Sequence, residues 1–311
     1  MRIYIIVSVV FFSNCIYEAQ AQSGAGLPVQ FIQFFKTYSL INPASIGKDS
    51  AIEFSTGNKS LTGAFSGVRT FYANANVQLN ARGKNKSKHV LGLTFINDKE
   101  GSFINRNRAS LVYAFHLPIS KKSTVSAGVS AGFINYSYKA SNISAGGSAF
   151  APNADIGLWL HRSNFNIGVS GNQIIASKLT PIDETYTIER HYNLTADRTF
   201  LLGPYLTLTP AFIFRWYDQE YYNADLALIL LIQDQVTTAL SYKYDRGVSV
   251  SGGLEDVKLG RNVWKVMFSY YFPLGSVNNY NPSAYELSLC FIPGVHRRGS
   301  NNRGSEMEEE E

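Results

Sequence analysis

The feature that most constrains this chain is a two-residue alternation of apolar and polar side chains along most of its length. Between residues 264 and 272, Trp, Val, Phe, Tyr and Phe occupy every second position, and residues 285–291 set Tyr, Leu, Leu and Phe against Glu, Ser and Cys. Successive residues of a strand point to opposite faces, so the pattern predicts β-strands. The longest uninterrupted apolar run after the first residues is Leu226 to Ile232, which is too short for a membrane-spanning helix.

The alternating segments number about fourteen, and no change of composition marks a second domain. The sequence therefore predicts a single all-β domain. The predicted strands cover residues 50–57, 60–80, 88–97, 102–117, 123–139, 152–161, 164–173, 187–201, 204–217, 221–232, 235–245, 247–256, 261–273 and 283–293.

The connections between these strands are of two kinds. Short turns are predicted at 118–122, 162–163, 202–203 and 233–234, and longer polar loops at 97–101, 140–151, 174–189, 217–221 and 275–283. Outer-membrane barrels have short periplasmic turns and longer extracellular loops. This distribution of short turns and longer loops, together with the strand periodicity, predicts a closed antiparallel transmembrane β-barrel of about fourteen strands.

A soluble secreted β-sandwich or jelly roll would also alternate apolar and polar residues. Three observations favour the membrane barrel. The predicted strands of about ten to sixteen residues exceed the usual five to six and suit a tilted membrane strand. Charged residues interrupt one face of good strands, as a polar lumen requires. Aromatic residues cluster near strand ends, where a membrane belt would lie, at Tyr136, Tyr138, Trp216, Tyr217, Tyr221, Tyr222, Tyr242, Tyr244, Tyr270 and Tyr271.

The first residues predict export. Arg2, an apolar run over residues 3–12 and the small residues of Ala19-Gln20-Ala21 have the form of a secretory signal peptide, with cleavage expected after Ala21. A lipoprotein anchored through Cys15 is the less favoured alternative, because Asn14 stands where a small residue is normal. After cleavage only Cys290 remains, so no internal disulfide can form.

Several short motifs occur along the mature chain in a recognisable order. They begin with Gln33-Phe34 and Asn42-Pro43-Ala44 and continue in Asn97-Asp98. Further stretches are Tyr113-Ala114-Phe115-His116-Leu117-Pro118-Ile119, Gly128, Ala131-Gly132-Phe133, Pro152-Asn153-Ala154-Asp155-Ile156-Gly157, Arg190-His191-Tyr192 and Ser283-Ala284-Tyr285-Glu286-Leu287. With these motifs the mature chain resembles the PorP/SprF family of outer-membrane proteins, which are associated with type IX secretion and gliding motility in Bacteroidetes.

The resemblance implies an accessory of type IX protein secretion that supports export or surface anchoring of a secreted adhesin. The implied partners are outer-membrane lipid, an adhesin with a type IX C-terminal domain, and the periplasmic ring and motor components. The alternative function is a porin-like channel for small solutes. The expected organisation is a signal peptide at 1–21, a periplasmic N-terminal segment at 22–49, the barrel at 50–294 and a polar, disordered tail at 295–311.

Two groups of residues are candidate functional sites. The first is a periplasmic docking or entry segment around Asn42-Pro43-Ala44, which also fits a plug; a simple turn into the barrel explains the same residues equally well. Its members are Gln33, Phe34, Asn42, Pro43 and Ala44. The second group is expected to line the lumen and form ion pairs there, and consists of Arg69, Arg106, Arg108, Asp155, Asp197, Asp225, Lys243 and Glu286.

The sequence gives no support for an enzyme, a metal or another cofactor. The five histidines show no metal-ligand spacing, and His116, beside a predicted turn, is expected to cap or pack rather than to catalyse. The net charge of +5 is spread along the chain without a basic stripe, so nucleic acid is not an expected partner.

Overall fold

The computed structural model describes residues 29–47, 50–79, 87–141, 145–182, 185–217, 222–274 and 282–294. The predicted signal peptide with its cleavage site, and the predicted tail at 295–311, lie outside the described residues. Within them the dominant structure is a single antiparallel sheet closed into a barrel of fourteen strands. Its strands are β1 (Ile52–Leu61), β2 (Arg69–Gln78), β3 (Lys88–Glu100), β4 (Ile104–Ser120), β5 (Ser123–Tyr138), β6 (Gly147–Arg162), β7 (Phe165–Asn172), β10 (His191–Arg198), β12 (Leu206–Tyr217), β13 (Tyr222–Ile232), β14 (Val236–Lys243), β15 (Gly247–Leu259), β16 (Asn262–Pro273) and β17 (Ala284–Ile292).

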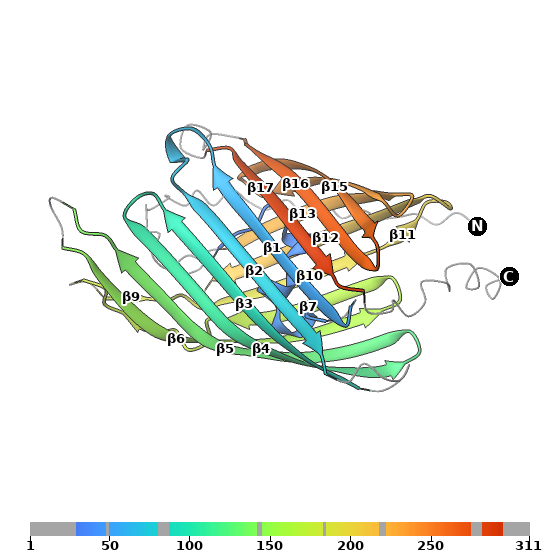
Figure 1. The fold of residues 1–311 in the computed structure, drawn as a ribbon, viewed down its shortest axis with the longest axis horizontal. Helices are drawn as coiled ribbons and strands as arrows, with labels where there is room; N and C mark the ends of the chain where they lie inside the picture. Colours follow the sequence, from blue (N-terminus) through green and yellow to red (C-terminus); the bar gives the residue numbers. More distant parts are fainter. Residues whose placement is uncertain are drawn as a thin grey trace, which may run out of the picture.

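Consecutively numbered strands of the ring pair with one another, and three further pairings complete it. The first strand, β1, pairs with the last, β17, in a register that sets Asn58 opposite Leu287. The shorter strands β7 and β10 are neighbours, and β10 pairs in turn with β12. Figure 1 shows the strands inclined to the long axis of the barrel, with β1 to β6 across the front. Closure leaves no sheet edge, which is the condition for a sheet to cross lipid.

Three short strands lie outside this ring. Strand β11 (Phe200–Leu201) pairs with one end of β12, and β8 (Lys178–Leu179) pairs with β9 (Tyr186–Thr187) inside the connection 173–190. No helix in the described part of the chain is both long and apolar enough to span a membrane.

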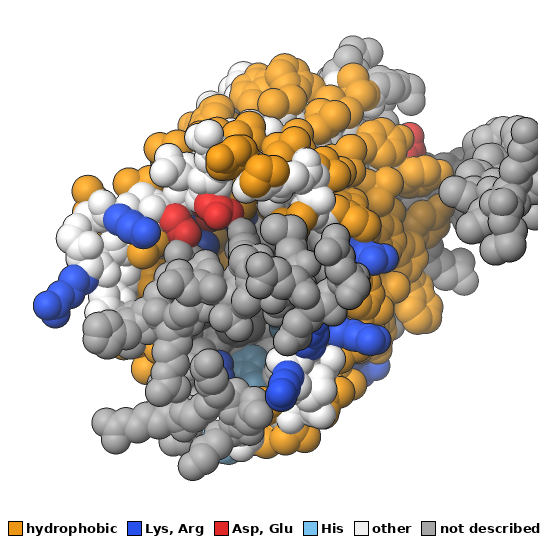
Figure 2. All heavy atoms as spheres, turned by 90° about the vertical axis from the view of Figure 1, so that its right-hand side faces the viewer, with side chains coloured by type: hydrophobic (Ala, Val, Ile, Leu, Met, Phe, Trp, Pro, Cys, Tyr) orange, Lys and Arg blue, Asp and Glu red, His pale blue; other side chains and the backbone are white. Residues whose placement is uncertain are grey.

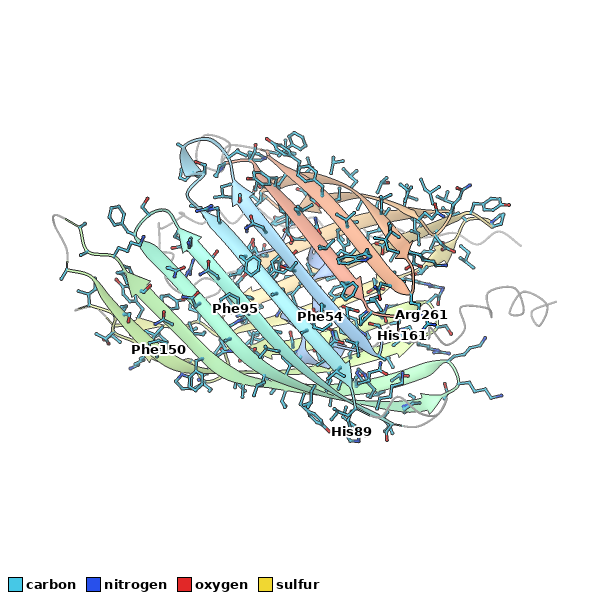
Figure 3. All side chains as sticks on the ribbon, viewed as in Figure 1. Phe54, His89, Phe95, Phe150, His161 and Arg261 are labelled. Atoms are coloured by element: carbon cyan, nitrogen blue, oxygen red, sulfur yellow. The ribbon has the colours of Figure 1, made fainter. Side chains whose placement is uncertain are left out.

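The predicted alternation is present as two faces of the wall. In β17, Tyr285, Leu287 and Leu289 are exposed on the outside, whereas Glu286 is fully buried in the lumen. The outer face is apolar, and Leu111 in the middle of β4 exposes 71% of its surface. Figure 3 shows Phe54, Phe95 and Phe150 on this outer face. In Figure 2, hydrophobic side chains cover the outer wall, and Lys and Arg side chains gather near the rim.

The aromatic belt is only partly as predicted. Trp216, Tyr222, Tyr242 and Tyr244 face outward and are about half exposed. Three other tyrosines expected in the belt point into the lumen because they fall on the inward-facing register of their strands, and these are Tyr136, Tyr217 and Tyr271.

The two ends of the barrel differ, as the predicted connections require. One end, called here the turn end, carries the connections 79–87, 121–122, 163–164, 199–205, 233–235 and 260–261. The other end, called the loop end, carries 62–68, 101–103, 139–146, 173–190, 218–221, 244–246 and 274–283. The turn end carries most of the shorter connections and the loop end most of the longer ones, although 79–87 is longer than a tight turn and 244–246 is as short as one.

The first two strands differ from the predicted spans. β1 continues to Leu61 rather than ending at residue 57, and the chain turns at 62–68, inside the predicted second strand. Gly63 provides the reason, since it adopts a φ of 65°, a conformation that glycine tolerates and other residues rarely adopt. The short helix η4 (Gly63–Phe65) begins there.

The outward orientation of Leu111 gives a test of membrane insertion. Leu111→Arg places a charge at the middle of a lipid-facing strand, and we expect it to lower the free energy of unfolding by about 2–4 kcal/mol. Leu117→Arg, nearer the end of the same strand, is expected to cost about 0–1 kcal/mol. Urea unfolding in phospholipid vesicles measures both, and equal effects at the two positions would contradict the predicted depth.

Candidate functional site

Residues 29–47 lie inside the barrel and fill a cross-section of its lumen. This segment, called here the plug, contains η2 (Phe34–Lys36), α1 (Tyr38–Ile41) and η3 (Pro43–Ser45). It is the dark-blue ribbon seen between the strands in Figure 1. Nearly every side chain in it is buried, including the polar Gln33 and Asn42. The segment predicted as periplasmic, residues 22–49, therefore has its described part within the barrel.

The Asn42-Pro43-Ala44 motif fixes one part of the plug to the wall. The Asn42 side-chain oxygen accepts a hydrogen bond from the Ala44 backbone N–H at 2.9 Å and thereby caps η3. Its Nδ2 donates to the backbone carbonyls of Leu158 on β6 and Val169 on β7, at 3.0 Å each. Pro43 occupies the first helical position, where a missing N–H leaves no unsatisfied donor.

A row of small residues gives this motif room to approach the wall. Ala114, Gly128, Gly157 and Ser170 are successive register partners across β4, β5, β6 and β7. A Cβ atom on Gly128 would overlap the backbone of Pro43 and Ala44, and one on Gly157 would overlap the side chain of Asn42. Glycine is thus required at both positions by close approach of the plug.

Two further contacts hold the same part of the plug. Ser170 Oγ donates to the carbonyl of Ile41 at 2.9 Å. His116 Nε2 lies 2.9 Å from the carbonyl of Ile46, and its Nδ1 lies 2.6 Å from Ser126 Oγ. His116 therefore has the packing and hydrogen-bonding surroundings expected for it, in contact with the plug.

The other part of the plug is held by the strands that close the barrel. The carboxylate of Glu286 on β17 accepts the Ile32 backbone N–H and, at 2.8 Å, the Tyr72 hydroxyl. Gln33 Nε2 donates to the carbonyls of Glu286 and Met267 at 3.1 and 3.2 Å. These bonds satisfy buried polar groups whose isolation would cost free energy.

Cationic side chains bind the first residues of the plug. Lys59 Nζ donates to the carbonyl of Gln30, and Lys243 Nζ donates to that of Phe31 at 3.1 Å. Arg246, in the loop-end connection 244–246, donates to the Gln30 side chain. The plug therefore extends from Gln30, near the loop end, to Gly47, whose carbonyl accepts a hydrogen bond from Gln78 at the turn end.

Asp225 is the centre of a buried charge cluster next to these contacts. Its carboxylate is fully buried and forms ion pairs with Arg215 at 2.9 Å, with Lys243 at 3.2 Å and with Arg246. One anion thus neutralises part of the charge of three cations, two of which also hold the plug. The sequence singled out Asp225 and Lys243 but not Arg215 or Arg246, whose partners depend on strand register.

The remaining predicted lumen residues occupy separate places on the wall. Arg106 pairs with Asp98 at 2.9 Å and with Glu100. Asp155 accepts hydrogen bonds from Ser130 Oγ at 2.6 Å and from the Gln173 backbone N–H at 2.8 Å.

Two other residues predicted to line the lumen, Asp197 and Arg69, have different surroundings. Asp197 accepts from Asn166 at 2.7 Å and faces Tyr38 of the plug. Arg69 does not join the lumen group, because Thr70 and Tyr72 take the inward register of β2 and leave Arg69 on the exposed side with Phe71.

Among the described residues, a cavity lies on each side of the plug. A vestibule of about 1350 Å³ lies on the turn-end side, lined by Lys36, Ile46, Glu255, Lys265 and the last residues of β17. A cup of about 60 Å³ lies on the loop-end side, between the plug and strands β3, β4, β10 and β12. Within the described residues, no group of three or more His, Cys, Asp or Glu is placed to hold a metal ion.

Comparisons with known proteins identify both the family and the fold. The family model described as "Type IX secretion system membrane protein PorP/SprF" matches residues 23–291. No curated protein matches the chain.

Several solved outer-membrane proteins have a similar structure. The toluene transporter TbuX of Ralstonia pickettii aligns with a TM-score of 0.54 at 11% identity, over 83% of this chain and 93% of its own. The monoaromatic hydrocarbon channel CymD aligns with a TM-score of 0.56 at 10% identity, over 83% and 92%. The toluene transporter TodX of Pseudomonas putida aligns with a TM-score of 0.52 at 10% identity, over 82% and 93%. At such identities the likeness concerns the fold, which is that of an outer-membrane barrel.

The charge cluster gives a prediction about stability. Asp225→Asn removes the carboxylate that Arg215, Lys243 and Arg246 share, so we expect the free energy of unfolding to fall by about 3–5 kcal/mol. Asp245→Asn makes the same chemical change at an exposed position on the adjacent turn and is the matched control. Denaturant unfolding of the two variants in vesicles measures the difference, and similar stabilities would contradict a structural role for the cluster.

The small-residue row gives a prediction about the plug. Gly128→Val forces the plug away from β5, so a cysteine introduced at the buried position Leu40 should react with a water-soluble maleimide about tenfold faster or more. The experiment uses a Cys290→Ser background, which removes the native thiol. Gly252→Val is the control, because open space surrounds that glycine. An unchanged labelling rate in Gly128→Val would show that the plug does not rest on this row.

Proposed function

We propose that this chain, which belongs to the PorP/SprF family of type IX secretion system membrane proteins, is a closed outer-membrane barrel that supports export or surface anchoring of a secreted adhesin. The family assignment rests on the match over residues 23–291. The observation that carries the proposal is the plug. A protein whose lumen is filled by its own buried segment is suited to holding partners at its two ends rather than to passing them through its centre.

The fixation of the plug supports this proposal. Its polar groups are bound by side chains or carbonyls of β1, β6, β7, β14 and β17, which lie around the barrel wall. Two of these bonds involve fully or nearly fully buried charged groups, Lys243 and Glu286, whose separation from their partners is costly. In the proposal, Gln33, Phe34, Asn42, Pro43 and Ala44 act as this plug, and Arg106, Asp155, Asp197, Asp225, Lys243 and Glu286 stabilise the lumen around it.

The two ends of the barrel offer different surfaces to the proposed partners. The loop end, with its longer connections, is the side on which a secreted adhesin with a type IX C-terminal domain would bind. The vestibule opens toward the turn end and has the volume to receive a peptide segment, which suits a periplasmic ring or motor component. Outer-membrane lipid would contact the exposed apolar wall between them.

A small-solute channel is the second candidate, and the fold is the observation that favours it. The similar solved structures are described as toluene transporters and monoaromatic hydrocarbon channels. Such a role requires a continuous path past the plug. Neither proposal includes a catalytic step.

A deletion strain distinguishes the two candidates. Under the accessory proposal, loss of the gene abolishes display of a type IX adhesin on intact cells, and the wild-type gene restores it. Surface protease shaving followed by detection of the adhesin measures display, with an unrelated outer-membrane protein as control for envelope integrity. Normal display in the deletion strain would refute the accessory proposal.

Conductance provides the complementary measurement. We expect purified wild-type protein in planar bilayers to show no large steady conductance, because the plug fills the lumen. We expect Gly128→Val to show conductance where Gly252→Val does not. A large steady conductance of the wild-type protein, together with unaffected adhesin display, would establish the channel alternative.

A further inference from the structure

We propose that the cup on the loop-end side of the plug is a binding site for a carboxylate group attached to a short apolar chain. The cup is bounded below by plug residues and at the sides by Arg106, Arg108, His191 and Arg215. The inference concerns the lumen alone, so it does not depend on the proposed role in secretion.

The charge of the cup favours an anion. Three arginines line it, and the only carboxylate in its lining is that of Asp98, so the charged lining has a surplus of two positive charges. Asp98 is engaged by Arg106 at 2.9 Å and by the Thr70 hydroxyl at 2.6 Å. Arg215 shares the carboxylate of Asp225 with Lys243 and Arg246, so the surplus resides on Arg108 and in part on Arg215.

Both of these arginines retain donors for a ligand. Arg215 is 97% buried, since its exposed fraction is 3%, and its Nη1 binds Asp225. Its Nη2 has no hydrogen-bond partner among the described residues. Arg108 is half-buried on the inward face of β4 and forms no ion pair within the described part of the chain. A buried guanidinium donor without an acceptor is costly unless an anion or water binds it.

The two arginines line the same cavity. Arg108 comes from β4 and Arg215 from β12, on separate parts of the wall, and both border the cup together with His191. Guanidinium groups bind carboxylates through paired, directional hydrogen bonds. The cavity volume of about 60 Å³ exceeds that of a single water molecule and suits a carboxylate with its first carbon atoms.

The floor of the cup specifies the rest of the ligand. Phe31, Leu40 and Ile41 of the plug and Ile96 of β3 present apolar side chains to the cavity. A phosphate dianion would lose hydration against such a surface without compensation, whereas the first methylene groups of an alkyl carboxylate would gain from burial. The chemistry is shared by small free carboxylates and by the terminal carboxylate of a polypeptide.

The test uses purified full-length protein in nanodiscs and isothermal titration calorimetry. Propionate is the probe, with propionamide as its neutral analogue and inorganic phosphate as the competing anion. We expect propionate to bind, and propionamide and phosphate to bind at least tenfold more weakly. Arg108→Gln should weaken propionate binding about tenfold or more, because a charge-assisted hydrogen bond is lost. Arg69→Gln, the same change on the exposed register at the same end of the barrel, should have no effect.

A peptide arm separates the two sources of the carboxylate. Binding of a short apolar peptide with a free terminal carboxylate, abolished by amidation, supports a polypeptide terminus; binding of propionate alone supports a small metabolite. Unfolding curves of Arg108→Gln that match those of Arg69→Gln establish that both variants are folded. Equal binding of propionate and propionamide, tighter binding of phosphate, an unaltered affinity in Arg108→Gln, or no binding of either carboxylate would each overturn the proposal.

Discussion

The constraint on which the rest of this structure depends is that backbone polar groups in lipid must find partners within the protein. A sheet meets this condition only when its first and last strands pair, as β1 and β17 do here. Closure also determines the space inside. Barrels of about eight strands are filled by their own inward side chains, and wider barrels enclose a cavity or channel. A ring of fourteen strands therefore leaves a lumen, and the plug occupies it.

Polar attachment distinguishes this lumen from a soluble core. The plug buries Phe31, Phe34 and Tyr38. Its position, however, is set by directional hydrogen bonds that the side chains of Asn42 and Gln33 donate to backbone carbonyls of the barrel wall. Apolar contact alone is non-directional and would allow the segment to slide along the barrel. The buried Glu286 adds specificity, because it accepts the Ile32 backbone N–H of the plug. Asp225 acts indirectly, because it pairs with Lys243 and Arg246, which in turn bind Phe31 and Gln30 of the plug.

Much of the wall could be predicted from sequence because strand periodicity is local. The alternation in residues 285–291 correctly places Glu286 inside and its neighbours outside, and the strand number is confirmed. Two residues were assigned to the wrong face of the wall. Arg69 and Tyr136 both lie on strands whose side chains alternate between lumen and lipid, but their identity alone does not determine which of the two faces each one occupies. The position of the plug could not be derived in the same way, since many of its contacts join residues more than a hundred positions apart. Gly128 and Gly157 carry the clearest signal, as strand glycines facing a lumen.

The bond between Ile32 and Glu286 has a consequence for how the molecule is built. It joins positions 254 residues apart in the chain, and the acceptor lies on the last strand of the ring. The Asn42 region, by contrast, binds β6 and β7 on another part of the wall. The plug therefore ties the last strand of the ring to strands near its middle, and Glu286 meets its donor only where β17 is in register with β1 and the plug is in place.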